Sequence, residues 1–359
     1  MVMINVTKTY LPDIEIYKSY VGKIYKSGWL TNNGEILNCL EKKLEQYLGV
    51  KNIVLVANAT LGLQIAYKLL NLTGEVITTP FSFVATTSSL LWQNINPVFS
   101  DIDKSTYNID IEKIEKKITN LTSAILPVHV FGNACDVEKI EKLSMKYNLK
   151  VIYDAAHAFN INYKNKSILN YGDISVVSFH STKLFHTIEG GAIIINDNSL
   201  YKKAKSMINF GFEDGEIKYL GINAKMNEFQ AAMGMCVLED INNVIASRKE
   251  IYMYYLSKLK NMPQISLQLQ NKHANQNYTY LPILLESEEK LVSTIKVMNL
   301  NGIYPRRYFY PSLNTLEYIN CKETMEISEN ISRRILCLPL YDSLEKSDVD
   351  IIVNILNSI

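Results

Sequence analysis

The sequence predicts an α/β fold: a mixed, mostly parallel sheet flanked by helices in a large domain, followed by a small C-terminal α+β domain. Short apolar runs alternate with amphipathic stretches between residues 50 and 195, a pattern typical of parallel strands joined by helices. The runs are continuous rather than alternating, which indicates strands buried on both faces. They cover residues 53–57, 76–79, 97–102, 124–130, 150–154, 174–179 and 192–195.

The pattern changes near residue 221, where a loop leads into a long helix that we expect to end at about residue 259. Beyond it lie an apolar run over 278–285, a helix near 291–298 and a final helix from about residue 348. A chain of 359 residues exceeds the length at which single cores stop growing. We therefore predict a large domain over 1–240, which includes the N-terminal segment, and a small domain over 241–359.

Composition excludes several classes of function. With 37 Lys and Arg against 36 Asp and Glu, the net charge of +1 gives no general attraction for nucleic acid. The five cysteines are far apart and form no CxxC, which argues against a disulfide framework or a zinc site. The N-terminus does not resemble a signal peptide, and no apolar segment approaches 18 residues. We expect a cytoplasmic protein without a membrane partner.

Polar residues follow four of the predicted strands, at residues 58–60, 80–83, 154–157 and 180–183. In open α/β sheets the ligand lies at the carboxyl ends of the strands. The candidate chemistry therefore falls on one edge of the sheet.

Two of these residues, Lys183 and Asp154, suit the cofactor pyridoxal phosphate. Lys183 has apolar neighbours in Phe179, Leu184 and Phe185, and desolvation lowers the pKa of an amine and makes it nucleophilic toward an aldehyde. Asp154 ends an apolar run, and a buried carboxylate needs a cationic or hydrogen-bonding partner, which a protonated pyridine nitrogen supplies. The alternatives are an ordinary loop lysine and an aspartate that caps the next helix. As a pair, the two residues predict a pyridoxal phosphate enzyme.

Further residues suit the rest of this cofactor. The turn that includes Ala59 and Thr60 opens a helix whose free N–H groups would bind a phosphate, and the Ser178 hydroxyl would add to that site. Phe83 would stack on the pyridine ring, and His157 would lie against the cofactor or bind its phenolic oxygen. The alternatives are a common strand-to-helix turn, a core aromatic residue and a satisfied polar residue.

The substrate candidates lie mainly in an aromatic and basic segment near residue 306. Such a mixture suits a phosphate and a sugar or base, although a solvated loop beside core aromatics is the alternative. His180 lies three residues before Lys183 and has no companions at metal-ligand spacing, so we predict no metal. The candidate substrate contacts are His180, Arg306, Arg307, Tyr308 and Tyr310.

As a set, the motifs resemble the DegT/DnrJ/EryC1/StrS family of sugar aminotransferases. The resemblance extends from residue 28 to residue 340 and rests on residues 57–60, 79–86, 154–159, 178–183, 189–191 and 221–223. It implies a pyridoxal phosphate enzyme of fold type I that works as a homodimer with two shared active sites.

The resemblance also implies roles for single residues. Lys183 would hold the cofactor aldehyde, Asp154 would pair with the ring nitrogen, and His157 would lie against the cofactor. The phosphate would be bound by Thr60 and Ser178, and by Asn223 of the partner subunit. The chain departs from the family's usual residues at four positions, which are Ala59 and Ile188 for Gly, Lys225 for Arg and Asn314 for His.

The activity implied is transfer of an amino group from glutamate to a dTDP-linked 3-keto or 4-keto-6-deoxyhexose, giving an amino-dideoxy sugar for surface polysaccharide such as O-antigen. One alternative is a sugar dehydratase of the same family, but those enzymes have His at the position of Lys183. Another is a non-catalytic, cofactor-binding regulator, which no helix-turn-helix or basic segment supports.

Overall fold

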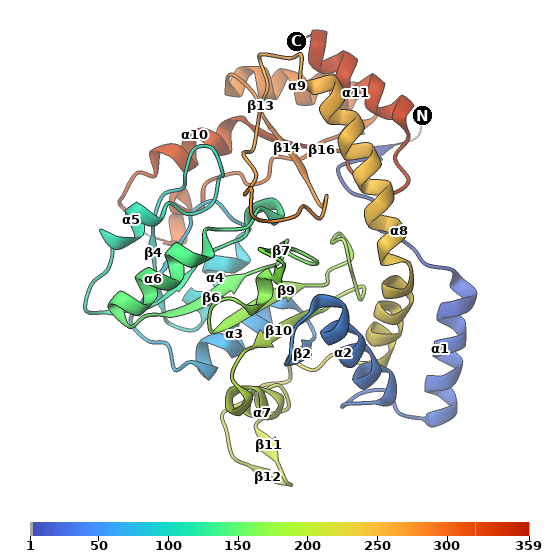
Figure 1. Cartoon of the computed structure of the whole chain (residues 1–359), viewed down its shortest axis with the longest axis vertical. Helices are drawn as coiled ribbons and strands as arrows, with labels where there is room; N and C mark the ends of the chain where they lie inside the picture. The colour runs from blue at the N-terminus through green and yellow to red at the C-terminus, as the bar shows by residue number, and fades with distance from the viewer. Residues whose placement is uncertain (1–2, 320, 359) are drawn as a thin grey trace.

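The computed structural model describes residues 3–319 and 321–358, and a seven-stranded sheet forms its centre (Figure 1). Only one strand, β10, runs antiparallel to its neighbours. The strands in spatial order are β2 (Ile53–Val56), β10 (Gly191–Ile195), β9 (Ile174–Ser178), β6 (Lys150–Asp154), β5 (Thr122–Leu126), β3 (Glu75–Thr78) and β4 (Asn96–Phe99). This architecture confirms the predicted fold class.

Helices cover both faces of the sheet, which explains the continuous apolar runs. On one face, Ile53 and Leu55 of β2 pack in a core with α2 (Glu35–Leu48) and the first half of α8 (Glu228–Leu259). On the other, Val54 and Val56 pack with α3 (Ala59–Leu69) and α7 (Asn198–Met207). Successive residues of a strand point to opposite faces, so each run supplies two cores.

Shorter elements complete the part of the chain before α8. The helices are α1 (Ile14–Ser27), α4 (Ala85–Trp92), α5 (Ile111–Glu115) and α6 (Val137–Tyr147). The small strands are β7 (Asn162–Tyr163) with β8 (Lys166–Ser167), and β11 (Phe212–Glu213) with β12 (Glu216–Ile217). The β11–β12 hairpin projects from the lower end of the molecule in Figure 1.

The long helix α8 joins the sheet to the C-terminal part of the chain (Figure 1). It begins with a capping box, because the side chain of Asn227 accepts from Gln230 N and that of Gln230 accepts from Asn227 N. Its residues up to Val244 belong to the core of the sheet, and those from Ile251 to Leu259 belong to a second core. The end of this helix is where the sequence predicted it.

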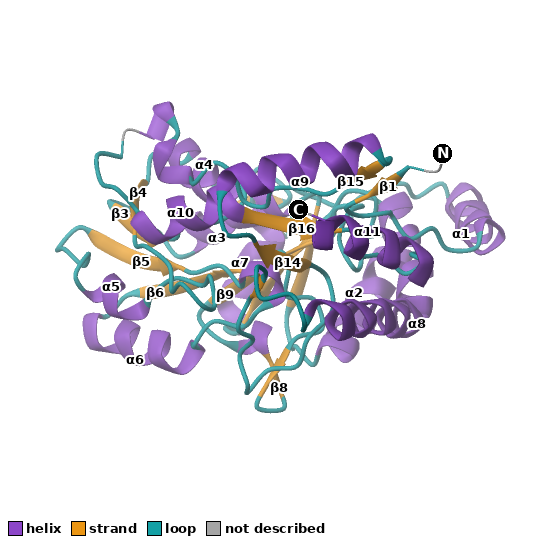
Figure 2. Ribbon diagram, turned by 90° about the horizontal axis from the view of Figure 1, so that it is seen from above, coloured by secondary structure: helices purple, strands orange, loops and turns teal. Residues whose placement is uncertain are grey.

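The second core lies in the C-terminal part, which has a three-stranded sheet and helices beside it (Figure 2). The elements are β13 (Ser266–Leu267), β14 (Leu281–Leu284), α9 (Glu288–Leu300), β15 (Ile303–Tyr304), α10 (Glu326–Arg334), β16 (Ile335–Leu338) and α11 (Lys346–Ser358). The first strand of the chain, β1 (Ile4–Asn5), pairs with β15, and Ile4 packs in this core. The domain boundary at residue 240 remains a prediction.

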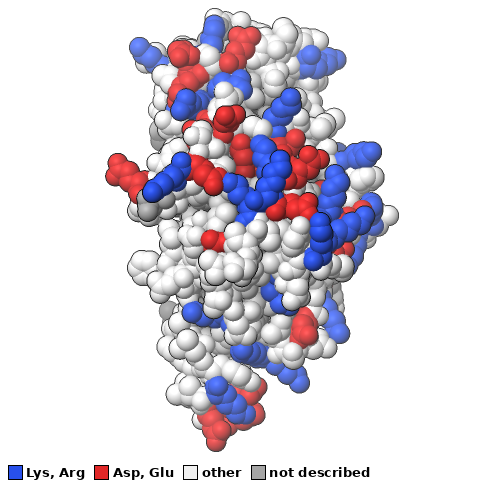
Figure 3. Space-filling model, turned by 90° about the vertical axis from the view of Figure 1, so that its left-hand side faces the viewer, with Lys and Arg blue, Asp and Glu red and all other residues white. Residues whose placement is uncertain are grey.

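Charges of both signs are interspersed over the face shown in Figure 3. In the described ranges 3–319 and 321–358, the helices are all too short or too polar to cross a membrane.

Candidate active site

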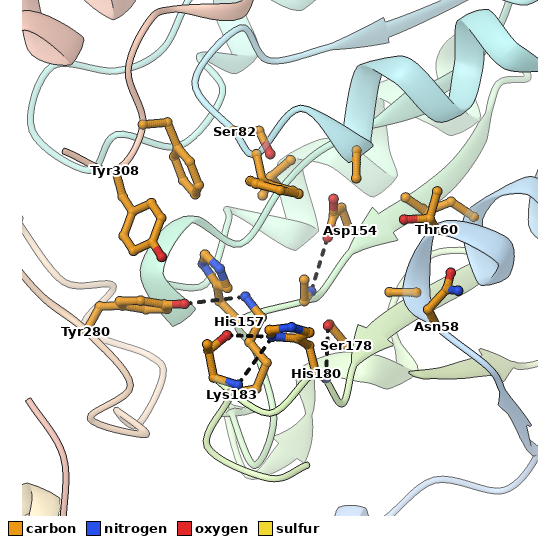
Figure 4. Close-up of a pocket in the computed structure, with 18 of the residues that line it drawn as sticks. Asn58, Thr60, Ser82, Asp154, His157, Ser178, His180, Lys183, Tyr280 and Tyr308 are labelled. Atoms are coloured by element: carbon orange, nitrogen blue, oxygen red, sulfur yellow. Dashed lines mark hydrogen bonds between the residues drawn. The ribbon is translucent and has the colours of Figure 1, made fainter. Parts of the chain in front are cut away.

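A cavity of about 310 Å³ lies at the carboxyl edge of the central sheet (Figure 4). Residues at or just after the ends of β2, β3, β5, β6 and β9 line one side of it, and residues from the C-terminal part line the other. The sheet therefore gathers side chains that lie far apart in the sequence.

Asp154 occupies the last position of β6 and is buried at the base of the cavity. Its Oδ2 accepts a hydrogen bond from Thr86 Oγ1 (2.7 Å), and its Oδ1 accepts from Ala156 N (3.1 Å). Burial raises the pKa of this carboxyl, while the two hydrogen bonds and the charge of Lys183 act in the opposite direction. A cationic N–H in the cavity would stabilise the ionised carboxylate further.

Lys183 lies in a turn after β9, where its backbone N–H donates to His180 O (2.8 Å). Its Nζ donates to Tyr280 Oη over 3.3 Å. Desolvation lowers the pKa of the amine to about 8, with Asp154 opposing the shift. About a tenth of the amine is therefore neutral and nucleophilic at pH 7, far more than for an exposed lysine.

His157 lines the cavity as a buried, neutral ring. Phe131 N donates to its Nδ1 (3.3 Å), and burial together with the charge of Lys183 keeps the pKa of His157 well below its usual value. The ring is stacked with Phe309 (5.9 Å between centroids) and tilted against Tyr280 (4.6 Å). Its contact with the cofactor remains a prediction.

The start of α3 forms the opposite end of the cavity. Asn58 caps the helix by accepting from Leu61 N (2.9 Å), and Ala59 and Thr60 line the cavity together with Ser178. The first N–H groups of a helix have no partner within it, so this end suits an anion. Gly191 passes so close that a Cβ would lie 2.7 Å from Ala59 N. This close approach explains why residue 191 is a glycine, since any side chain there would clash with the start of α3.

These features fit pyridoxal phosphate in one orientation. The α3 end offers N–H groups and hydroxyls to a phosphate, Asp154 offers a buried carboxylate to a ring nitrogen, and Lys183 offers an amine to an aldehyde. The cavity thus offers a partner to the phosphate, the ring nitrogen and the aldehyde of this cofactor.

The structure brings ten of the sequence-predicted residues to this cavity. Phe83 forms part of its wall with 58% of its surface exposed, which leaves the ring free to contact a ligand. The ten residues are Ala59, Thr60, Phe83, Asp154, His157, Ser178, His180, Lys183, Arg306 and Tyr308.

Two predicted substrate contacts, Arg307 and Tyr310, do not line the cavity. The Arg307 guanidinium is bound to Glu288 (2.6 Å) and to the carbonyl of Arg333 (3.0 Å). It also lies 3.5 Å from the centroid of the Tyr310 ring. The structure thus gives Arg307 a carboxylate partner outside the cavity, and neither residue lines the site that was predicted for the substrate.

Asn223 also lies outside the cavity of its own chain, and its Oδ1 accepts from Lys225 Nζ (2.8 Å). The expectation that it reaches the phosphate of a partner subunit remains a prediction.

The structure bears on two departures from the family's usual residues. Ile188 has a φ of 70°, in the left-handed region that favours glycine, so the structure explains the usual glycine and not the isoleucine. Asn314 is buried and donates to Glu329 Oε1 (2.8 Å) and to Glu323 O (3.2 Å), and it does not line the cavity. Its role in this chain is to hold the loop that contains it.

Tyr280 and Phe309, which line the cavity, and Thr86, which binds Asp154, were not among the predicted site residues. Phe309 lies in the aromatic segment near residue 306 and Thr86 in the motif over 79–86, so the sequence alone could have indicated both. Tyr280 lies within an apolar run of the C-terminal part, and nothing local distinguishes it from a core residue.

The fold and the cavity together are typical of a pyridoxal phosphate enzyme of fold type I. Comparison with known proteins agrees, since residues 13–357 match the DegT/DnrJ/EryC1/StrS aminotransferase family. The chain belongs to this family and is a pyridoxal phosphate-dependent aminotransferase.

Several relatives are similar over nearly their whole length. The dTDP-4-amino-4,6-dideoxy-D-glucose transaminases of Shigella dysenteriae and Escherichia coli are 41% and 40% identical, covering 99% and 96% of each chain respectively. The crystal structure of DesI in the presence of its TDP-sugar product superposes with a TM-score of 0.94 at 29% identity, covering 99% of this chain and 92% of DesI. Helicobacter pylori PseC, an aminotransferase involved in the biosynthesis of pseudoaminic acid, gives 0.91 at 28%, covering 99% of both chains.

Proposed function

We propose that this enzyme transfers the amino group of glutamate to C4 of a dTDP-linked 4-keto-6-deoxyglucose. The observation that carries the proposal is the 41% identity, over 99% of both chains, with a transaminase named for dTDP-4-amino-4,6-dideoxy-D-glucose. The cavity supports it with the amine, carboxylate and anion site described above. The products would be 2-oxoglutarate and the 4-amino sugar.

The cofactor, when bound, supplies an aldehyde that accepts the amino group and a cationic ring that withdraws electrons from the reacting carbon. Asp154, in its ionised form, would hold the proton on the ring nitrogen. Thr60, Ser178 and the start of α3 would hold the phosphate.

Once the amino donor has displaced it from the aldehyde carbon, Lys183 Nζ would carry the proton in both halves of the reaction. In the first half it would act as a base toward the α-carbon of glutamate and then release that proton to the cofactor carbon that bears the transferred nitrogen. In the second half it would take a proton back from that carbon and act as an acid toward C4 of the sugar. A positioned proton transfer of this kind contributes roughly 10²–10⁴-fold to a rate. The pKa of about 8 suits this task, because the amine can both accept and release a proton near neutral pH.

A homodimer with shared sites is part of the proposal. Exposed apolar side chains support it, among them Trp29 (55% exposed) and, in the segment around Asn223, Phe210 (48%) and Ile222 (37%). Phe210 and Ile222 are neighbours, since Phe210 N donates to Ile222 O (3.2 Å), and a contiguous exposed apolar patch marks an interaction site. Asn223 would then complete the phosphate site of the second subunit.

We further propose a cytoplasmic enzyme whose product enters surface polysaccharide. A relative that is 27% identical, the SpsC protein of Bacillus subtilis, is named for spore coat polysaccharide biosynthesis. The supply of an activated amino sugar is the step that such a pathway would need.

The experiment is to incubate the purified holoenzyme with glutamate and, separately, with dTDP-linked 3-keto and 4-keto-6-deoxyhexoses. We expect a 4-amino-4,6-dideoxyglucose nucleotide, identified by mass and NMR. Amination of the 3-keto sugar alone would contradict the proposed position, and amination of neither would contradict the proposed substrate.

A further inference from the structure

Arg306 is a cation without an anionic partner at the cavity. Apart from Lys183, it is the only Lys or Arg among the described residues that line this space. No carboxylate of the described chain lies within ion-pair distance of it. Its guanidinium carbon lies 5.1 Å from the centroid of the Tyr308 ring.

The backbone of Arg306 is fixed, whereas its side chain is exposed. Arg306 N donates to Cys337 O (3.2 Å) and Cys337 N donates to Arg306 O (2.8 Å), which ties the residue to the buried strand β16. The backbone of Arg306 is thus held at a defined place on the C-terminal wall, and its side chain lines the same cavity as Lys183. A fixed backbone and a guanidinium without an ion-pair partner suit the binding of a planar anion.

The other charged groups of the cavity are not paired with Arg306. The carboxylate of Asp154 is bonded to Thr86 and Ala156, and that of Glu189 lies 3.6 Å from His180 Nε2. The cofactor phosphate has its own site at the start of α3. The anion for Arg306 must therefore come from a substrate.

Resting on the proposed function, we propose that Arg306 binds a carboxylate of the amino donor. In glutamate the two carboxylates lie within a few carbon atoms of the amine that must reach Lys183. In a nucleotide-linked sugar the hexose ring separates the keto carbon from the diphosphate, so the diphosphate is farther from the reacting carbon than either carboxylate of glutamate is. An anion site inside the cavity therefore fits the donor better than the diphosphate.

The test compares Arg306→Gln and Arg306→Lys with Arg307→Gln, the adjacent arginine that is paired with Glu288 outside the cavity. Binding of glutarate, a dicarboxylate that lacks an amine and cannot react, is measured calorimetrically on each holoenzyme. We expect about tenfold weaker binding for Arg306→Gln, a smaller loss for Arg306→Lys and no change for Arg307→Gln, since one charge-assisted contact contributes about a factor of ten.

The two half-reactions are then followed separately through the absorption of the bound cofactor. We expect Arg306→Gln to raise the glutamate concentration needed for half-maximal rate about tenfold and to leave the sugar half-reaction within about twofold. Unchanged glutarate and glutamate binding would overturn the proposal, as would a defect confined to the sugar half-reaction, which would assign Arg306 to the diphosphate. Because glutarate binding needs no sugar, this result does not depend on the sugar substrate being correct.

Discussion

The Nζ of Lys183 and the Oη of Tyr280 lie 3.3 Å apart, although 97 residues separate them in the chain. The phenol is buried, and burial raises the pKa of Tyr280 well above its usual value, so the hydroxyl stays protonated. Tyr280 therefore gives the lysine amine a neutral hydrogen-bond partner on the C-terminal wall of the cavity. It holds the amine in place without fixing it as an ion pair.

Replacing Tyr280 by Phe should slow capture of pyridoxal phosphate by the cofactor-free protein about fivefold, which corresponds to one neutral hydrogen bond of about 1 kcal/mol. The ring would remain to pack against His157 and Tyr308. The rate is measured from the absorption of the bound cofactor. Tyr255→Phe is the control, because the hydroxyl of Tyr255 is buried in the other core without a described partner. Equal rates in both variants would show that Tyr280 does not position the amine.

The rate of cofactor capture should also depend on pH through Lys183. Burial lowers the pKa of this amine to about 8, and only the neutral amine attacks an aldehyde. The rate should therefore rise with pH, from about a tenth of its maximum at pH 7 to about nine-tenths at pH 9. Stopped-flow absorption from pH 6 to pH 10 measures this profile. A midpoint near 10.5 would mean that the lysine is not desolvated.

Thr86→Val removes the hydroxyl that donates to Asp154 while keeping the shape of the side chain. Because this hydrogen bond lowers the pKa of Asp154, its loss should raise that pKa and move the acidic limb of the pH–rate profile to higher pH. Thr87→Val is the matched control, since the buried hydroxyl of Thr87 has no partner in the described structure. If the acidic limb lies at the same pH in both variants, Asp154 does not control the protonation of the ring nitrogen.

Mixing two inactive variants tests the shared active site. Lys183→Ala lacks the amine, and Asn223→Asp places a carboxylate where a phosphate is expected. If Asn223 serves the partner subunit, half of the randomly mixed dimers regain one normal site, and activity should return to about a quarter of the wild-type value. If Asn223 serves its own chain, mixing restores no normal site and the activity stays at the level of the variants.

The sequence was sufficient to predict the sheet and the residues that follow its strands directly. Lys183, Asp154 and Thr60 lie within a few residues of a strand end, so the topology fixes which edge they occupy. Tyr280 could not be found in this way, because its contact with Lys183 depends on how the C-terminal part packs against the sheet. Arg306 lines the cavity, whereas Arg307 is paired with Glu288, which lies 19 residues away in the chain. No local sequence pattern distinguishes the two arginines.

The central claim is that Lys183 binds the cofactor covalently. The most direct measurement is borohydride reduction of the holoenzyme, followed by proteolysis and mass spectrometry of the peptide that carries the cofactor. The account predicts that the added mass lies on Lys183 and is absent from Lys183→Ala. Attachment to a different lysine, or an unmodified Lys183 in a fully loaded enzyme, would contradict it.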